Sequence, residues 1–400
     1  MLGLDLIWWF IAMRLLKKPW GRLFLSLFMV LQVAAITNEL IGRLGVENVD
    51  IRSKVILSVT IIWHYLALPV LVGIGFAYVC IKVFRRYRAK KANQNKTAIP
   101  PANMEGVSRR EFLGACAALT PPLLTFGLTG ISVAQLNHFR VRRFTLSLPT
   151  LPRQLDGLTI AHITDTHVGE WTHGKVLQDM VNTTNSLRTD LVLMTGDLIN
   201  WELSDLSGAI DLMKAMTGRY GHYMIEGNHD QYQNGPEFER RVKASGIPLL
   251  LDESVTTNIR GYPVQFFGLR WMEGLGKQRD MITSSQMTEL MKQRHPDAFP
   301  ILLAHHPHAF DAAVKADLPL TLSGHTHGGQ LMLDNQIGVG PALFRYWSGR
   351  YQRNQSQLVV SNGVGNMFPI RVNAPAEIVH LTLRCVETIT YFSGRFLLGS

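Results

Sequence analysis

The chain has 400 residues, of which 46% are hydrophobic and 18% charged, and its formal net charge is +10. The excess of positive charge lies in residues 1–143, with 19 Lys and Arg against 6 Asp and Glu, whereas residues 144–400 contain 21 against 24. A slightly acidic second part lacks the basic surface that duplex nucleic acid requires, so we expect no nucleic-acid partner. The length leaves room for a membrane region followed by one domain of about 240 residues.

Residues 1–110 have the composition of a membrane region. Residues 55–81 contain no charged side chain, which exceeds the roughly 20 apolar residues needed to span a bilayer. Residues 23–38 are also uncharged, and their neighbours extend this stretch to a span over about 20–42. Residues 2–16 are too short to cross, so we expect an interfacial segment or a re-entrant piece there.

Basic residues predict how these spans are oriented. Residues 82–110 carry nine Lys or Arg and one acidic residue, whereas residues 39–54 carry three of each. The positive-inside rule therefore places 82–110 in the cytoplasm as a basic linker. We expect a multi-pass protein of the inner membrane.

A third apolar segment follows the basic linker, within residues 111–143. It begins after Ser108-Arg109-Arg110-Glu111-Phe112-Leu113-Gly114, which resembles the twin-arginine export motif, and residues 112–135 are uncharged. We expect a single crossing followed by a connector, which puts residues 144–400 outside the cytoplasm. Two alternatives stay open: the arginine pair only anchors the span, or Pro121-Pro122 makes the segment re-entrant and leaves the domain cytoplasmic.

Beyond residue 144, five short polar motifs each follow a strand-like apolar run. The runs are residues 158–164, 191–195, 223–226, 301–304 and 318–323. The motifs are Asp165-Thr166-His167, Gly196-Asp197, Gly227-Asn228-His229-Asp230, His305-His306 and Gly324-His325-Thr326-His327-Gly328-Gly329. The carboxyl ends of strands in α/β sheets gather at one edge, and Asp, His and Asn are ligands of divalent metals.

Each motif alone has an ordinary structural explanation. A single His after a strand is usually a hydrogen-bonded core residue, and Gly-Asp and Gly-Asn are common turn formers. Five such motifs in order favour a metal site instead. Helical stretches alternate with the strands at residues 173–187, 206–216, 236–244, 284–294 and 307–315, which predicts a layered α/β fold.

At these motifs the chain resembles the calcineurin-like metallophosphoesterases over roughly residues 156–384. The resemblance implies a two-sheet α/β/β/α sandwich over residues 144–400 and two divalent metal ions, either Mn, Fe or Zn. By the same resemblance, Asp197 would bridge the two ions. The other metal ligands would be Asp165, His167 and His327 for the first ion, and Asn228, His305 and His325 for the second.

The resemblance also implies two catalytic residues outside the ligand set. His229 would contact the scissile phosphate and assist the leaving group, and Asp230 would orient His229. Asn200 departs from the family pattern, because many relatives have a second Asp there, but that position is not a ligand. His306 and His308 either line the substrate pocket or lie on the surface.

These features predict a dimetal-dependent phosphoesterase, which we expect to be a phosphodiesterase acting by attack of a metal-bridged hydroxide. The twin-arginine-like motif resembles the signal of the membrane-anchored or exported bacterial branch of the family, although it is internal here and amino-terminal in many relatives. We expect membrane lipid as a partner, besides a phosphate-ester substrate. One alternative is a pyrophosphatase like the UDP-2,3-diacylglucosamine hydrolases of lipid A synthesis, because a membrane tether suits a lipid-linked substrate. The other alternative is an inactive scaffold of the same fold.

Overall fold

The computed structural model describes residues 2–43, 53–91, 108–274, 276–334 and 336–386. The chain divides into two compact units, Met1–Ala134 and Gln135–Ser400.

The first unit is helical. Its helices are α1 (Leu2–Leu15), α2 (Pro19–Arg43), α3 (Lys54–Ile62), α4 (Leu68–Lys91) and α5 (Arg109–Gln135), and a π-helical turn, Trp63–Ala67, joins α3 to α4. Three described segments are long and apolar enough to cross a membrane, namely Pro19–Asn38, Lys54–Tyr87 and Arg109–Gln135. These segments overlap the three expected spans and meet the length and composition that a span requires. Helix α5 continues through Pro121 and Pro122, where we had considered a break.

The π-helical turn holds two polar side chains against α1. Trp63 Nε1 donates a hydrogen bond to Asp5 Oδ1 over 2.7 Å, and His64 Nε2 lies 3.0 Å from Asp5 Oδ2. The Asp5 side chain is fully buried, and a buried carboxylate is costly unless such partners compensate it. These contacts therefore fix α1 against the helix that runs from Lys54 to Lys91.

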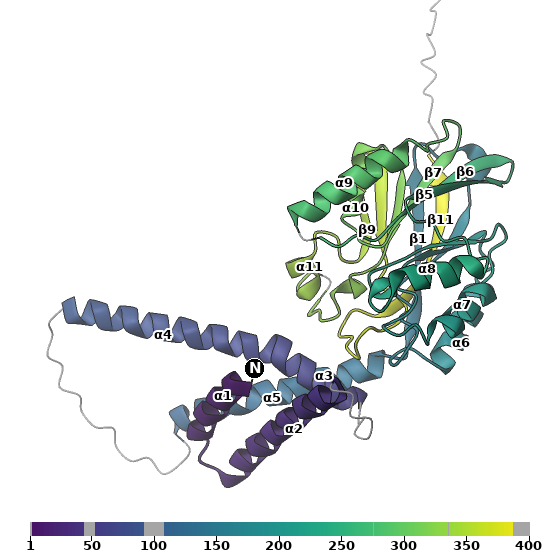
Figure 1. Cartoon of the computed structure of the whole chain (residues 1–400). Coiled ribbons are helices and arrows are strands. Elements are labelled where there is room, and N and C mark those ends of the chain that lie inside the picture. Colours follow the sequence, from purple (N-terminus) through teal and green to yellow (C-terminus); the bar gives the residue numbers. More distant parts are fainter. Residues whose placement is uncertain (1, 44–52, 92–107, 275, 335, 387–400) are drawn as a thin grey trace, which may run out of the picture. The chain divides into compact units, whose positions relative to one another are not determined.

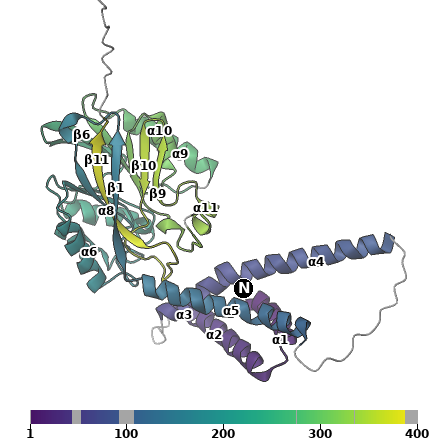
Figure 2. The ribbon, with the colours of Figure 1, turned by 180° about the vertical axis from the view of Figure 1, so that it is seen from behind.

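The second unit contains two sheets (Figure 1). The first sheet has the order β1-β11-β2-β3-β4, formed by β1 (Phe139–Leu148), β11 (Ala376–Cys385), β2 (Thr159–Ile163), β3 (Leu191–Thr195) and β4 (His222–Ile225). Strands β2, β3 and β4 are parallel, whereas β11 runs antiparallel to β2 and parallel to β1. Figure 2 shows β1 beside β11 from behind.

The second sheet has the order β5-β6-β7-β8-β10-β9. Its strands are β5 (Glu253–Ile259), β6 (Tyr262–Leu269), β7 (Phe299–Ala304), β8 (Leu320–Ser323), β10 (Ser356–Val360) and β9 (Gly349–Arg353). The four central strands are parallel, and the two edge strands, β5 and β9, are antiparallel to their neighbours.

Side-chain alternation along the strands builds the layers. In β3, Leu191 and Leu193 join the apolar core between the sheets, together with β7 and β8 residues such as Ile301 and Leu322. Val192 and Met194 point the other way, into the core beneath the outer helices. Both faces of these strands are buried, which explains why they read as unbroken apolar runs.

Helices cover the outer face of each sheet. Helices α6 (Lys175–Ser186), α7 (Leu206–Ala215) and α8 (Gly235–Ala244) pack on the first sheet, and α9 (Lys277–Met291) and α10 (Ala309–Lys315) pack on the second. A short helix, α11 (Val339–Leu343), lies in the connection between β8 and β9. This arrangement confirms the expected two-sheet α/β/β/α sandwich.

Strand β1 starts at Phe139, so it already includes residues 139–143, which we had assigned to the connector. Arginines alternate with apolar residues in much of this stretch, a pattern that is typical of a strand with one exposed face. Arg140 and Arg142 both reach the buried carboxylate of Glu377 on the neighbouring strand β11.

Candidate dinuclear metal site

The five predicted motifs come together where strands of both sheets end. They directly follow β2, β3, β4, β7 and β8. Backbone hydrogen bonds join these loops in pairs: the Asp165 N–H donates to the carbonyl of Gly196 over 2.9 Å, and the Gly324 N–H donates to the carbonyl of His305 over 3.1 Å. The sandwich core thus brings residues more than 100 positions apart into one cluster.

The backbone at the site is held in an uncommon conformation. Five of the seven predicted metal ligands have positive φ, namely Asp165 (53°), His167 (44°), Asp197 (56°), His325 (72°) and His327 (48°). Left-handed backbone is disfavoured for side chains with a Cβ and persists where surrounding structure enforces it, most often at functional sites. The strain therefore supports a functional role for these loops.

Two glycines in the motifs are required by close approach. A Cβ atom at Gly227 would lie 2.2 Å from Asp197 Oδ1, and a Cβ at Gly324 would lie 2.2 Å from Asp165 Oδ2. Any larger residue would push the loop away from the carboxylate. The motif glycines thus allow the backbone to reach the predicted ligands.

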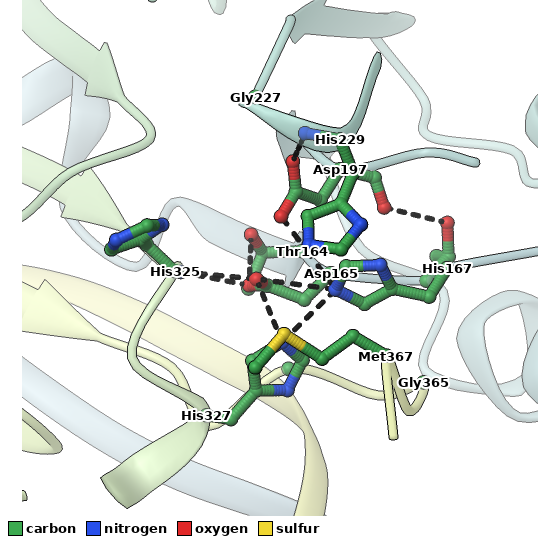
Figure 3. A network of polar contacts seen from close by, with 12 residues as sticks. Thr164, Asp165, His167, Asp197, Gly227, His229, His325, His327, Gly365 and Met367 are labelled. Atoms are coloured by element: carbon green, nitrogen blue, oxygen red, sulfur yellow. Dashed lines mark hydrogen bonds and ion pairs between the residues drawn. The ribbon is translucent and has the colours of Figure 1, made fainter. Parts of the chain in front are cut away.

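Asp165, His167 and His327 form the first group of candidate ligands (Figure 3). His167 Nε2 and His327 Nε2 lie 2.9 Å apart, and His327 Nε2 lies 3.4 Å from Asp165 Oδ1. All three side chains are buried. Their donor atoms lie within 4.8 Å of one another, so the group could hold a metal ion.

Asp197, His305 and His325 form a second such group. His305 Nε2 lies 3.1 Å from Asp197 Oδ2 and 3.2 Å from His325 Nδ1. The amide oxygen of Asn228 joins this group, because it lies 2.9 Å from His325 Nδ1. The structure therefore brings together all four side chains predicted to share the second ion.

Asp197 links the two groups. Its Oδ2 lies 3.6 Å from His167 Nε2 in addition to its contact with His305. Its Oδ1 accepts the backbone N–H of His229 over 2.8 Å, which fixes the carboxylate plane. This is the position that a bridging carboxylate requires.

The atoms that converge at the site are suited to binding cations. His305 Nδ1 lies 2.7 Å from the carbonyl of Thr195, which can only accept, so Nδ1 carries the proton. In the neutral ring, Nε2 then directs a lone pair towards Asp197 Oδ2 and His325 Nδ1. Several buried acceptors that face one another repel unless a proton or a metal ion lies between them.

The pKa values of the site residues reflect the same close approach of buried polar groups. Burial alone would lower the pKa of His305, but the carboxylates of Asp197 and Asp165 raise it to about 9. Burial raises the pKa of the Asp165 carboxyl to about 6. Burial, reinforced by His305, lowers the pKa of His325 to about 3. The carboxylates therefore attract positive charge to this cluster.

His229 lies beside the ligands with a fixed orientation. The carbonyl of Asn200 lies 2.7 Å from its Nδ1 and accepts that proton, which leaves Nε2 for another partner. Its ring contacts the His167 ring edge-on, with centroids 4.4 Å apart. Burial lowers the pKa of His229, and the negative charge of Asp197 opposes this shift.

Asp230 has a different position from the one we expected. Its carboxylate accepts the backbone N–H groups of Asp197, Leu198, Ile199 and Gly227, at 2.9 to 3.1 Å. The residue that orients His229 is Asn200, through its carbonyl, because Asp230 points back into the loop. Asp230 therefore holds the Gly196-Asp197 loop against the Gly227 loop and acts on His229 only through the backbone.

Arg371 supports the site through His327 and the neighbouring loop carbonyls, and the sequence did not predict this role. The buried guanidinium donates to the carbonyls of Gly365 (2.6 Å) and Ala374 (2.9 Å), and its Nη2 lies 3.3 Å from His327 Nδ1. Burial lowers its pKa to about 10, so it remains charged at neutral pH. Because its partners are mainly backbone carbonyls, no sequence pattern marks this role.

Aromatic side chains border the cluster on two sides. Trp201 lies 4.8 Å from His229 by ring centroids and stacks on Tyr232. Trp271 lies 5.5 Å from His305 and 5.2 Å from His325. The sequence allows His306 either a pocket or a surface position. Its side chain is buried, and its ring centroid lies 4.7 Å from that of His325.

The fold and the cluster together define a class of protein. The chain has an α/β/β/α sandwich with two adjoining His/Asp groups at its strand ends. This combination is typical of metal-dependent hydrolases. Residues 158–329 match the family model for calcineurin-like phosphoesterases. The matched residues therefore form a calcineurin-like phosphoesterase domain, which is the domain of a metal-dependent phosphoric ester hydrolase.

Curated relatives carry the same family name. The chain is 29% identical over 294 residues to the uncharacterized metallophosphoesterase YkuE of Bacillus subtilis, covering 70% of this chain and 99% of the relative. It is 28% identical over 290 residues to a transmembrane protein with metallophosphoesterase domain of Danio rerio, covering 70% of this chain and 65% of that relative. A solved dimetal phosphatase from Danio rerio matches 57% of this chain and 93% of its own at 13% identity and a TM-score of 0.36.

Replacing the shared carboxylate tests the site. We expect Asp197→Asn to lower bound metal from about two ions per chain to about one or fewer, because a carboxamide whose oxygen accepts the His229 N–H turns an NH2 group, which cannot bind a metal ion, towards both histidine groups. The variant should still fold, since the amide oxygen can accept the His229 N–H. Elemental analysis of purified protein measures the metal content. The matched control is Asp190→Asn, at the opposite end of β3, which should keep both ions. Two ions in Asp197→Asn would contradict the assignment.

Proposed function

We propose that the chain is a membrane-anchored, dimetal-dependent phosphodiesterase. The observation that carries the proposal is the Asp197 carboxylate, which lies between two histidine groups and contacts both. The complete set of seven ligand side chains argues against an inactive scaffold, because a scaffold has no need to keep mutually repelling acceptors buried together.

Asp165, His167 and His327 would hold one ion, Asn228, His305 and His325 the other, and Asp197 both. When bound, such ions neutralise phosphate charge and lower the pKa of water towards neutrality. The donor set of nitrogen and oxygen without thiolate suits Mn, Fe or Zn.

His229 is proposed as the residue that protonates the leaving group. Its Nδ1 is occupied by the Asn200 carbonyl, so Nε2 is the atom available to the departing oxygen. A negatively charged substrate beside the ring would favour the protonated form that a general acid needs. Asp230 would act as a positioning residue, through the backbone of the Asp197 loop.

The aromatic side chains favour a diester over a monoester. Trp201 and Tyr232 flank the His229 side of the cluster, whereas Trp271 flanks the His305 and His325 side. A phosphodiester has two organic substituents, each of which could contact one aromatic wall. A monoester would use only one.

Removal of the proposed acid should depend on the leaving group. We expect His229→Ala to lower kcat by about 10²–10⁴-fold on an alkyl phosphodiester, the usual loss for a general acid. The loss should be much smaller on bis(p-nitrophenyl) phosphate, because nitrophenolate leaves without a proton. Steady-state kinetics with Mn²⁺ measures both. The control His222→Ala lies at the opposite end of β4 and should match the wild type. Equal losses on both substrates would instead assign His229 to charge stabilisation.

We further propose that residues 144–400 lie outside the cytoplasm of an inner-membrane protein. The basic linker 82–110 and the uninterrupted helix α5 support a single crossing before the domain. A cytoplasmic domain would instead favour the lipid-linked nucleotide pyrophosphatase, because nucleotide sugars are cytoplasmic.

Protease treatment of intact spheroplasts tests the side of the membrane. We expect digestion of the domain without lysis, detected with an antibody against it, while a cytoplasmic marker protein stays intact. Protection of the domain until the membrane is lysed would reject export and make the pyrophosphatase the leading function.

A further inference from the structure

Arg279 is a cation without a carboxylate partner at the edge of the candidate metal site. It belongs to α9, and its Nη1 donates to His306 Nε2. Its guanidinium lies 5.8 Å from the ring centroid of Trp271. Within the described residues, no carboxylate oxygen forms an ion pair with this guanidinium, for which a nitrogen and an oxygen must lie within 4.0 Å of each other.

The environment of Arg279 makes this lack of a partner costly. Its Nε is buried and has no hydrogen-bond partner among the described residues. Burial lowers the pKa of the guanidinium, and the neighbouring Asp280 only partly offsets this effect. A partly desolvated cation is unfavourable unless an anion compensates it. Among the described residues Asp280 offsets the effect only in part, so an anionic ligand would complete the compensation.

A single side chain, His306, lies between Arg279 and His325, one of the predicted ligands of the second ion. His306, which accepts its hydrogen bond, lies 4.7 Å from His325 by ring centroids. Trp271 contacts the rings of both His325 and His305. A phosphate held by the metal ligands would therefore leave Arg279 to face the next part of the substrate.

A cavity opens at this point. Arg279, Trp271, His305 and His308 line it, and a larger cavity of about 290 Å³ lies next to it, because Thr283 and His308 line both. The larger cavity has charges of both signs: Lys315 lines it, and Arg345 and Arg353 do so while paired with Asp311. The first cavity thus brings Arg279 and a predicted metal ligand, His305, to one wall.

We propose that Arg279, backed by His306 and Trp271, binds a second phosphate group of the substrate, next to the phosphate that is cleaved. This inference rests on the proposed function of the metal site and narrows the substrate to esters with two phosphates. A guanidinium suits this role because its planar fork binds phosphate through two hydrogen bonds. The contact with His306 Nε2 holds the guanidinium beside Trp271 at the wall of the cavity.

Two esters that differ by one phosphate test the proposal. They are ethyl p-nitrophenyl phosphate and p-nitrophenyl 2-phosphonooxyethyl phosphate, and nitrophenol release by the full-length protein in detergent with Mn²⁺ gives kcat/KM. We expect the wild type to prefer the second ester. Arg279→Ala should lower kcat/KM on that ester by about 10- to 100-fold, mainly through KM, the usual effect of losing a hydrogen bond to a charged group. On the first ester it should change kcat/KM by less than about twofold.

Two further variants sharpen the test. Arg279→Lys keeps the charge without the fork and should recover part of the preference. Arg294→Ala, which removes a guanidinium bonded to the Ala316 carbonyl just beyond α9, should behave as wild type on both esters. Equal losses on both esters in Arg279→Ala, or no loss on either, would overturn the proposal.

Binding separates this inference from the proposed function. Calorimetric titration of the same protein with ethylene glycol bisphosphate and with ethyl phosphate measures affinity without turnover. We expect the bisphosphate to bind more tightly to the wild type, and Arg279→Ala to abolish that difference. If the wild type hydrolyses neither ester but shows this pattern, the proposed activity fails and the subsite stands. An unchanged difference in the variant overturns the subsite whatever the activity.

Discussion

The site depends on one electrostatic constraint: a buried carboxylate, Asp197, lies among histidine nitrogens that the fold directs at it. The carbonyl of Thr195 holds the proton of His305 on Nδ1, which turns Nε2 towards Asp197. On the other side, His167 Nε2 faces the same carboxylate. Such an arrangement of acceptors is stable only with positive charge between them, and in a water-excluded cluster two divalent ions supply it best. Bound metal ions would therefore stabilise this cluster.

The rest of the domain holds these groups in place. The loops after β2 and β3 lie in left-handed conformations at Asp165, His167 and Asp197, and backbone hydrogen bonds between the loops compensate that strain. Asp230 and Arg371 serve the same purpose with side chains, the first by accepting four backbone N–H groups and the second by donating to loop carbonyls. The rigid core between the two sheets then fixes the distance between loops from different sheets.

The sequence predicted the elements that carry the motifs and missed those held by distant partners. The strands before the five motifs were predictable, because both faces are buried and each run ends in a polar motif. The start of strand β1 was missed, although Arg140 and Arg142 alternate with apolar residues, because the partner that holds them, Glu377 on β11, is more than 200 residues away in the sequence. Arg371 and Arg279 were missed for a related reason: backbone carbonyls and a histidine ring in distant loops determine their roles, and neither leaves a mark in the sequence.

The central claim is that the chain holds two metal ions bridged by one carboxylate. Electron paramagnetic resonance of the full-length protein loaded with Mn²⁺ tests this most directly, because ions that share a bridging ligand are magnetically coupled. We predict about two Mn²⁺ per chain, with the spectrum of a coupled pair at full loading. A spectrum of isolated, uncoupled Mn²⁺ at full loading, or binding of a single ion, would contradict the account.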